Sequence, residues 1–308
     1  MSPAPAIRGR GPWELAFERL RHDRAAIASA VTILLAVVVA LAAPLIAQAT
    51  GHSPIEQFSE TGLSPSGIPV GPSREFWFGT DGLGRDVLVR IAYGTRISLL
   101  VGVLASALAV LMGAVVGIAA GWHGGAVDTF LSRFMDVVLS LPFLVLALAL
   151  AALVGPGLGV SIFLIAFFSW ASVGRIVRAE ARVIREREYV QAARAMGASS
   201  ARIMFVEMLP VVSATVIVYA TLLIPSAIAF EATLSFLGLG VPPPTPTWGN
   251  MLFDAMAYYR VAWWLLVFPG AALLGITYAF NVLGDSVRDA LDPRYDQTVL
   301  RSGGGDAE

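Results

Sequence analysis

The sequence predicts an all-α membrane protein with six transmembrane helices. It is strongly apolar, its apolar residues gather in long charge-free runs, and a Gly/Pro turn divides the longest run. Of its 308 residues, 56% are hydrophobic and 14% are charged, and the mean hydropathy is +0.73. A soluble domain is usually about 45–50% apolar and about 25% charged. The composition is therefore typical of a membrane protein, and a net charge of -1 gives no indication of a nucleic-acid partner.

Six spans follow from the charge-free runs, since a span needs roughly 20 mostly apolar residues and a central charge costs about 2.5–3.5 kcal/mol on insertion scales. The longest run, Val137–Gly174, holds two spans, because VGPGLG (Val154–Gly159) is typical of a tight turn. The predicted spans lie near 27–49, 97–120, 135–154, 159–174, 209–230 and 262–284.

These spans divide the chain into a short list of segments. Trp13, Phe17 and Leu20 recur at helical spacing among charges, which predicts an amphipathic helix on the membrane surface; a frayed polar tail is the alternative. The segments are an arm with this helix (1–26), the first span (27–49), an outer loop (50–96), a core of five spans (97–284) with loops at 175–209 and 231–261, and a tail (285–308).

The arginines predict the orientation, because loops on the cytoplasmic side of a membrane are rich in Arg and Lys. With six spans, both termini lie on one side. The arm, the 121–134 loop, the 175–209 loop and the tail carry sixteen arginines, and the other side carries five. We therefore expect the termini and the 175–209 loop to be cytoplasmic.

The chain lacks two residue types that carry chemistry in other proteins. It has no cysteine, which excludes disulfides, thiolate metal sites and cysteine nucleophiles. All 21 basic residues are arginine, so no P-loop lysine is present. The three histidines fall outside the predicted spans, and no HExxH zinc helix occurs. We therefore expect no catalytic residue, metal site or cofactor in this chain.

Polar residues and prolines near the spans are most simply explained by helix packing. Arg133 and Asp136 are three residues apart, which predicts an ion pair at a helix end. No carboxylate falls in the middle of a predicted span. Ser169, Thr221, Tyr278 and Asn281 either bond neighbouring helices or line a polar path. Three prolines, Pro142, Pro225 and Pro269, are expected to kink their helices.

The 175–209 loop predicts two short helices joined at a glycine. Glu188–Met196 and Ala201–Leu209 are rich in Ala, Met, Glu, Gln and Arg, which favour helix. Gly197 lies between them, where a left-handed residue can end the first helix. Ser199 or Ser200 can cap the second. An ordinary interfacial helix between spans is the simplest alternative.

This loop resembles the EAA loop of ABC importer permeases. The motif reads Glu-Ala-Ala, three residues, Gly, nine residues, an apolar residue, one residue, Leu-Pro; here Gln191 replaces the Glu and Glu207 replaces the apolar residue. Glu188 is a second candidate for the polar contact of the missing Glu. The resemblance implies a type I ABC importer permease fold and a coupling helix that contacts a cytoplasmic ATPase. It assigns this contact to Glu188, Gln191, Ala192, Ala193, Arg194, Ala195, Met196, Gly197, Ala198, Leu209 and Pro210.

Two further stretches favour one branch of that family. FGTDGLGRDVLVRIAYGTRISL (78–99) also allows a simple turn, with Asp86 capping a short helix through Tyr93. EATLSFLGLGVPPPTPTWGNML (231–252) is a Gly/Pro-rich loop in which Pro242–Pro244 resist regular structure. Both resemble signatures of the dipeptide/oligopeptide/nickel branch, specifically its DppC/OppC-type subunit. The matching residues include Gly79, Thr80, Asp81, Leu83, Gly84, Arg85 and Asp86, and Leu237, Gly238, Pro244, Trp248 and Gly249.

The resemblance implies a permease subunit in the bacterial cytoplasmic (inner) membrane, in contact with lipid. Its partners would be a homologous permease, two ATPase subunits and a periplasmic or lipid-anchored substrate-binding protein. Dipeptides or oligopeptides are the expected cargo, with nickel, glutathione or another small solute as alternatives. A secondary transporter or channel would be expected to show mid-membrane ionisable residues or interrupted helices. Neither is evident in the sequence, and the three histidines leave no buried Ser–His pair for an intramembrane protease.

Overall fold

The computed structural model describes residues 12–291, and the ends of the predicted arm and tail (1–11 and 292–308) lie outside the described residues. Helices account for most of this part of the chain. In order they are α1 (Pro12–His22), α2 (Arg24–Thr50), α3 (Val87–His123), α4 (Gly125–Ser140), α5 (Phe143–Val154), α6 (Leu158–Arg185), α7 (Glu188–Ala195), α8 (Ser200–Arg202), the π-helical turn η1 (Ile203–Met208), α9 (Leu209–Phe236), α10 (Trp248–Ala255) and α11 (Trp264–Leu291).

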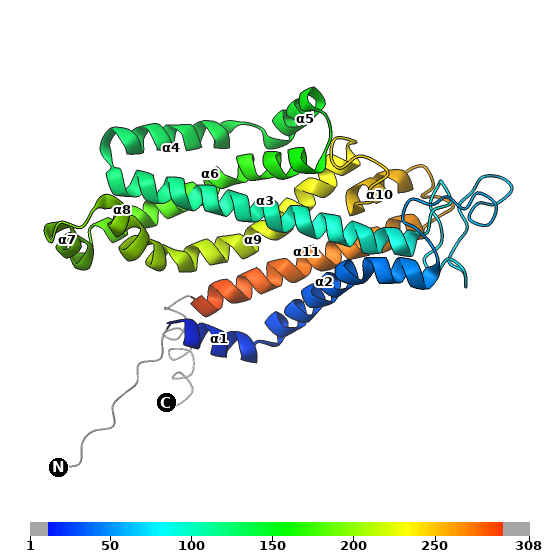
Figure 1. The fold of residues 1–308 in the computed structure, drawn as a ribbon, viewed down its shortest axis with the longest axis horizontal. Coiled ribbons are helices and arrows are strands. Elements are labelled where there is room, and N and C mark those ends of the chain that lie inside the picture. The colour runs from blue at the N-terminus through cyan, green and yellow to red at the C-terminus, as the bar shows by residue number, and fades with distance from the viewer. Residues whose placement is uncertain (1–11, 292–308) are drawn as a thin grey trace, which may run out of the picture.

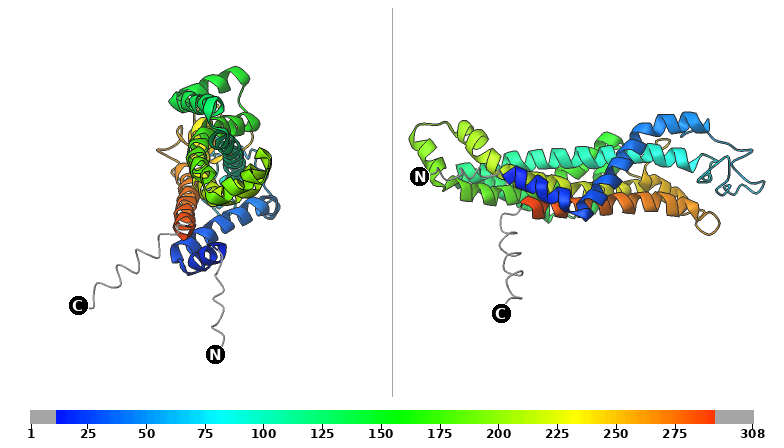
Figure 2. Two further views of the ribbon diagram at one scale, coloured as in Figure 1. Left: turned by 90° about the vertical axis from the view of Figure 1, so that its left-hand side faces the viewer. Right: turned by 90° about the horizontal axis from the view of Figure 1, so that it is seen from below.

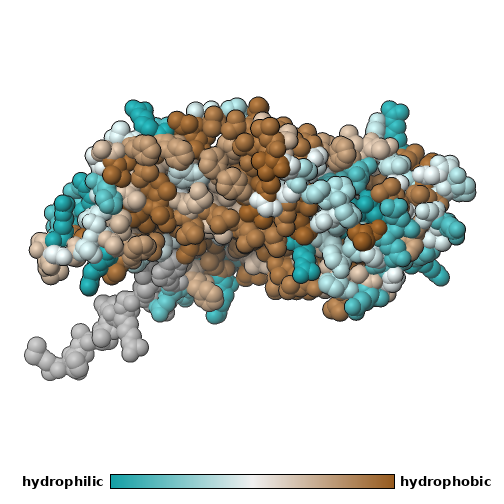
Figure 3. Space-filling view, turned by 45° about the horizontal axis from the view of Figure 1, so that its top comes forward, coloured by the Kyte–Doolittle hydropathy of each residue, from teal (hydrophilic) through white to brown (hydrophobic). Residues whose placement is uncertain are grey.

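The helices form an elongated bundle (Figures 1 and 2). Helices α3, α6 and α9 make its central layer, α2 and α11 cover one side, and α4 and α5 lie on the other. Helices α7 and α8 project at one end, here called the α7 end, and the 51–86 loop and α10 lie at the opposite end, the α10 end. On the face shown in Figure 3, apolar side chains cover the middle of the molecule and hydrophilic residues gather at both ends, as a bilayer requires.

Within residues 12–291, five helical runs are long and apolar enough to cross a membrane, and a sixth exists if the bent pair α4–α5 counts as one span. The five are α2, α3, α6, the run from Ser200 to Phe236, and α11. Several helices extend past their predicted spans: α3 already begins at Val87, α6 continues to Arg185, and α9 and α11 run on to Phe236 and Leu291. The charges that end a span do not end a helix, so charge-free runs underestimate helix length.

The third predicted span, 135–154, was wrong as a continuous helix. Helix α4 ends at Ser140, α5 begins at Phe143, and the two are bent by 86°. Leu141 is extended (ψ 133°), the conformation that a residue before proline prefers. Pro142 therefore breaks the helix rather than kinking it. By contrast, α9 and α11 continue through Pro225 and Pro269.

Glycines bring α3 and α6 into direct backbone contact. A Cβ added at Gly117 would lie 2.7 Å from the carbonyl oxygen of Gly174, and Gly113 and Gly121 pack as tightly on the same helix. Small residues four apart allow such close approach between membrane helices. The result is a tightly packed pair that carries the long end of α6 beyond the apolar band.

The predicted amphipathic helix is present as α1, and it is attached to the end of α11. Arg19 Nη1 donates to the carbonyl of Ala290 at 3.1 Å, and Ser286 Oγ donates to Asp23 Oδ2 at 2.7 Å. The second hydrogen bond lowers the pKa of Asp23, which also caps α2. Phe17, from the predicted apolar face, has 69% of its side chain exposed. The first and last described helices are thus joined at the α7 side of the bundle.

Candidate functional site

The segment predicted to couple to an ATPase is a helix, a glycine turn and a second helix, as the sequence indicated. Helix α7 ends at Ala195, and Gly197 adopts the left-handed conformation (φ 84°). The Gly197 amide donates to the carbonyl of Arg194 at 3.0 Å, and the Ala198 amide to that of Ala193 at 3.1 Å. These bonds close the turn, and we call residues 194–199 the elbow.

The second helix starts at Ser200, and it does not stop before the fifth span. Ser199 caps it, because its Oγ accepts from the Arg202 amide at 3.3 Å. The helix then passes through the π-helical turn η1 into α9. The predicted boundary near Leu209 is therefore absent, and the run from Ser200 to Phe236 is continuous. The irregular turn ends just before Pro210, which cannot donate a backbone hydrogen bond.

Two side chains hold the inner face of α7 against the bundle. Val190 and Ala193 are buried and pack in one cluster with Ile184, Ile203 and Met208. Ala193 thus holds α7 in place rather than offering a surface for a partner. The other predicted coupling residues of α7 and the elbow face solvent: Glu188, Gln191, Ala192, Arg194, Ala195 and Gly197, with Met196 82% exposed and Ala198 half-buried. Leu209 is half-buried and Pro210 exposed, both inside the second helix.

The two departures from the EAA pattern have different surroundings. Gln191 Nε2 donates to the carbonyl of Glu186 at 3.3 Å, so its amide stabilises the connection between α6 and α7. A Glu side chain could not donate this bond. Glu207 lies half-buried in η1, in the second helix, whereas Gln191 precedes the elbow.

A pocket of about 370 Å³ lies beside α7, at the end of α3. Trp122, Arg185, Val190 and Gln191 are among the residues that line it. The Arg194 guanidinium carbon is 6.0 Å from the Trp122 ring centroid, and Arg185 Nη1 donates to the Trp122 carbonyl at 3.2 Å. Both contacts connect the elbow region to α3.

Arginines on the extended end of α6, residues 175–185 (the α6 stalk), bind carboxylates on α4. Asp128 is 4% exposed and accepts from both Arg178 and Arg182. Arg175 Nη2 donates to Asp136 Oδ1 at 2.6 Å. The predicted Arg133–Asp136 pair is looser, at 3.9 Å between nitrogen and oxygen. The stalk is therefore bonded to α4 as well as packed against α3.

The α10 end contains a cluster of two arginines and two aspartates, in which Arg85, Arg90 and Asp81 are buried and Asp254 is half-buried. Arg85 Nε lies 2.6 Å from Asp81 Oδ2, Arg90 Nε lies 3.2 Å from the same oxygen, and Arg85 Nη2 lies 3.3 Å from Asp254 Oδ2. Burial raises the pKa of Asp254, although the two arginines oppose this shift. The two positive and two negative charges offset one another.

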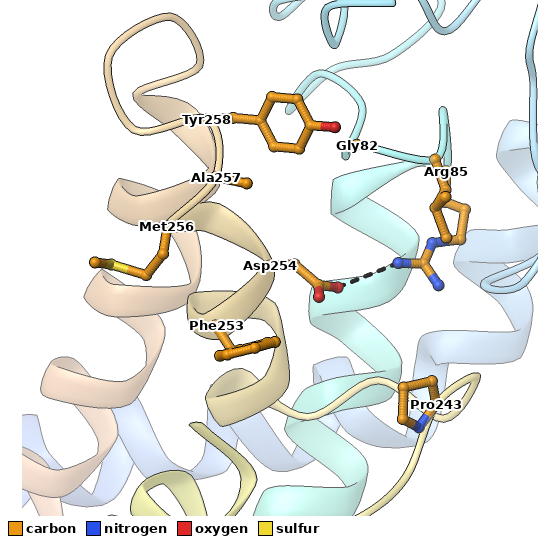
Figure 4. A pocket seen from close by; sticks show the side chains of 9 residues that line it. Gly82, Arg85, Pro243, Phe253, Asp254, Met256, Ala257 and Tyr258 are labelled. Atoms are coloured by element: carbon orange, nitrogen blue, oxygen red, sulfur yellow. Dashed lines mark hydrogen bonds and ion pairs between the residues drawn. The ribbon is translucent and has the colours of Figure 1, made fainter. Parts of the chain in front are cut away.

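Asp254 and Arg85 face a pocket of about 550 Å³ at this end (Figure 4). It is lined by Gly82 and Leu83 from the first stretch that the sequence singled out, by Pro243 from the second, and by Phe253 and Tyr258 from α10 and the turn after it. The structure thus brings the two stretches together, at the opposite end of the bundle from the elbow.

The first stretch is a compact cap on α3. Gly79 and Gly84 have positive φ (77° and 73°). Thr80 Oγ1 donates to the Gly62 carbonyl at 2.5 Å, and Trp264 Nε1 to the Thr80 carbonyl at 3.1 Å. Asp86 Oδ1 accepts from the Leu88 amide at 2.8 Å, and its Oδ2 lies 2.7 Å from His52 Nδ1. Asp86 therefore caps the whole of α3, not a short helix that ends at Tyr93.

The second stretch begins inside a helix, which corrects its predicted start. Glu231 lies within α9 and is completely buried, whereas the sequence placed it in a loop after the fifth span. Helix α9 ends at Phe236, and Leu237 and Gly238 (φ 78°) form the turn after it. Pro244 lies in the following loop. Trp248 and Gly249 begin α10, a helix that was not predicted, and both are buried.

Comparison with known proteins decides the family. The family model described as "Binding-protein-dependent transport system inner membrane component" matches residues 113–297, more than half of the chain. The chain belongs to this family. A second model, described as the N-terminal TM domain of oligopeptide transport permease C, matches residues 11–65 of the permease.

Relatives are similar to the permease over most of its length. The dipeptide transport system permease protein DppC of Alkalihalophilus pseudofirmus is 40% identical over 92% of this chain and 90% of its own. The oligopeptide transport system permease protein OppC of Bacillus subtilis is 36% identical, with the same coverage of both chains. A solved structure, titled as inward-facing conformations of the MetNI methionine ABC transporter, superposes with a TM-score of 0.54 at 17% identity. It covers 66% of this chain and 96% of its own, and supports the fold.

Several residues of the permease went unnoticed in the sequence. Arg90 and Asp254 complete the ion cluster, His52 pairs with Asp86, and Asp128 receives the stalk arginines. Their partners lie 34 or more residues away in most cases, so no local pattern marks them. The glycine spacing at 113, 117 and 121 was a usable signal for the α3–α6 contact. Among the described residues, no group of three or more His, Asp or Glu is gathered to hold a metal.

Proposed function

We propose that this permease is one subunit of an ATP-driven importer for dipeptides or oligopeptides in the bacterial inner membrane. It pairs with a homologous permease to form the path, two ATPase subunits bind ATP and Mg²⁺, and a substrate-binding protein delivers the cargo. The names of its relatives support this substrate class. The arginine-only composition is consistent with hydrolysis on a partner.

The elbow is the contact with the ATPase, and its geometry carries this proposal. Arg194 to Ser199 are largely exposed at the tip of the α7 end, while Val190 and Ala193 fix the helix behind them. A surface that is both accessible and rigidly supported can transmit force. The second helix leads from this surface directly into a span without a hinge loop.

The α7 end faces the cytoplasm and the α10 end faces outward. The excess of arginines at the α7 end supports this orientation, by the same positive-inside bias that orients other membrane proteins. The outward end then carries the 51–86 loop and α10, where a binding protein would release its cargo.

Uptake into proteoliposomes tests the proposal. The complete transporter is reconstituted with the elbow facing the vesicle interior, and binding protein loaded with labelled dialanine is added outside. Dialanine should accumulate inside the vesicles only when they contain ATP. Excess glutathione or Ni²⁺ should not compete. Gly197→Pro should abolish uptake although the permease still inserts, because proline cannot adopt the positive φ of this turn. Uptake of nickel or glutathione but not dialanine would contradict the substrate class, and normal uptake by Gly197→Pro would contradict the elbow.

A further inference from the structure

The buried carboxylate of Glu231 accepts hydrogen bonds from two hydroxyl groups on different helices. Ser98 Oγ on α3 donates to its Oε2 at 3.1 Å, and Ser235 Oγ on α9 donates to its Oε1 at 2.6 Å. Thr247, next to Trp248 in the chain, caps α10. No arginine or histidine in residues 12–291 forms an ion pair with it. Hydroxyl groups, rather than a cation, therefore satisfy this acid.

Each of these hydroxyls also accepts a hydrogen bond from the backbone. Ser235 Oγ accepts from the Val241 amide at 3.2 Å, and Ser98 Oγ from the Trp248 amide at 3.5 Å. Thr247 Oγ1 accepts from the Asn250 amide at 3.2 Å. A hydroxyl that accepts from an N–H keeps its single proton for another acceptor, and for Ser98 and Ser235 that acceptor is Glu231. The carboxylate thus stabilises, through the two serines, both ends of the loop 241–248.

Two glycines allow the residues on either side of this loop to pack closely against the same turn of α9. A Cβ at Gly240 would lie 2.6 Å from the Ser235 Cα, and one at Gly249 would lie 2.7 Å from the Ala232 Cα. The Asn250 side chain closes the loop from within, because its Nδ2 donates to the Thr245 carbonyl at 2.8 Å. The loop and α10 are therefore one unit, attached to α9 at Glu231–Ser235 and to α3 at Ser98.

The helix that carries Glu231 also leads to the elbow. The run from Ser200 to Phe236 has 37 residues, which corresponds to about 55 Å at the usual rise of a helix. Glu231 lies near one end of this run and Gly197 lies just before the other. A displacement of α10 can therefore reach the elbow along one helix, provided that α10 remains attached at Glu231.

We propose that Glu231 is the positioning residue that transfers movement of α10 and its loop to α9 and α3, and so to the elbow. This inference rests on the proposed function, since it assumes that a binding protein acts at the α10 end and an ATPase at the elbow. Without the carboxylate, both serine hydroxyls lose their acceptor, and the loop is released from α9 and α3.

The test compares Glu231→Gln, Glu231→Ala and Ser235→Ala in the complete transporter in nanodiscs. Thr233→Ala is the matched control, because its hydroxyl lies in the same turn but donates to the Ala229 carbonyl within α9. Two quantities are measured: hydrogen exchange of peptides that contain the Val241 and Trp248 amides, and the ratio of ATPase rates with and without dialanine-loaded binding protein. Glu231→Gln preserves shape but has one acceptor oxygen instead of two.

Glu231→Ala should speed exchange at both amides and lower the stimulation ratio by about tenfold, the loss expected for one buried hydrogen bond. Glu231→Gln should lie between Glu231→Ala and wild type, and Thr233→Ala should match wild type. Faster exchange with an unchanged stimulation ratio would show that Glu231 has a purely structural role, and would overturn the inference. Unchanged exchange in Glu231→Ala would overturn it too, because the loop would then not depend on the carboxylate. If dialanine-loaded binding protein does not stimulate the ATPase of the wild-type transporter, the proposed substrate is contradicted instead. The exchange data then test by themselves whether Glu231 attaches the loop to α9 and α3.

Discussion

Arg178 on the α6 stalk binds Asp128 on α4 with two guanidinium nitrogens. Its Nη2 lies 3.0 Å from Asp128 Oδ2, its Nε bonds Oδ1, and Arg182 adds a third bond to the same carboxylate. Asp128 is buried, whereas Arg182 is exposed. One carboxylate therefore joins two helices that are separated by the bend at Pro142, and it holds the stalk that carries α7.

Removal of this carboxylate charge should destabilise the permease. We expect Asp128→Asn to lower the free energy of unfolding by about 1.5–3 kcal/mol, because hydrogen bonds to a charged group are lost. Thermal unfolding of the purified permease measures the change. Arg133→Ala is the control: Arg133 has 80% of its side chain exposed and pairs only loosely, so the expected change is under about 1 kcal/mol. Equal unfolding temperatures for both variants would contradict the role of Asp128.

The close contact of α3 and α6 predicts different effects for two glycines. Gly117→Ala should destabilise the permease by about 1–3 kcal/mol, because its Cβ would collide with the Gly174 carbonyl. Gly159→Ala should be neutral or slightly stabilising, since no atom lies within 4 Å of its added Cβ. The measurement is thermal unfolding of both variants in one detergent. If Gly117→Ala unfolds like Gly159→Ala, the packing of the two helices is looser than described.

Asp254 predicts a pH dependence of stability. Burial raises its pKa in the folded protein above the value of the unfolded chain, so the folded state binds the proton more tightly. Stability relative to Asp254→Asn should therefore increase as the pH falls through the raised pKa. It should level off below about 3.9, the ordinary pKa of an aspartate. Unfolding temperatures across this range measure the difference, and a difference that shrinks as the pH falls would have the wrong sign.

Two substitutions at Gly197 distinguish the effect of backbone strain from the effect of blocking a partner's approach. Its added Cβ would meet no atom of this chain within 4 Å, and asparagine tolerates positive φ better than other non-glycine residues. Gly197→Asn should therefore leave the unfolding temperature of the isolated permease nearly unchanged. In the complete transporter it should reduce dialanine uptake, because a side chain now stands where the ATPase approaches. Gly197→Val should impair both properties, and full uptake by Gly197→Asn would refute a close approach at this residue.

The sequence predicts what depends on neighbours in the chain. Apolar runs located the spans, and Gly197 and Ser199 marked the elbow, because turns and caps depend on a few adjacent residues. The VGPGLG turn likewise separates α5 from α6. By contrast, the contact between Glu231 and Ser98 joins residues 133 positions apart, and no local pattern distinguishes a buried glutamate from one in a loop. The break at Pro142 was expected only as a kink, since its size depends on the packing of α4 and α5.

The central claim, that the elbow contacts an ATPase, is tested most directly by cross-linking. The chain has no cysteine, so Ser199→Cys introduces a single one, which is modified with a maleimide-linked photocross-linker in the complete transporter. Ser66→Cys, exposed in the loop at the α10 end, is the matched control. We predict a covalent product of permease and ATPase from position 199 and none from position 66. A product with the ATPase from position 66, or with the binding protein from position 199, would contradict the account.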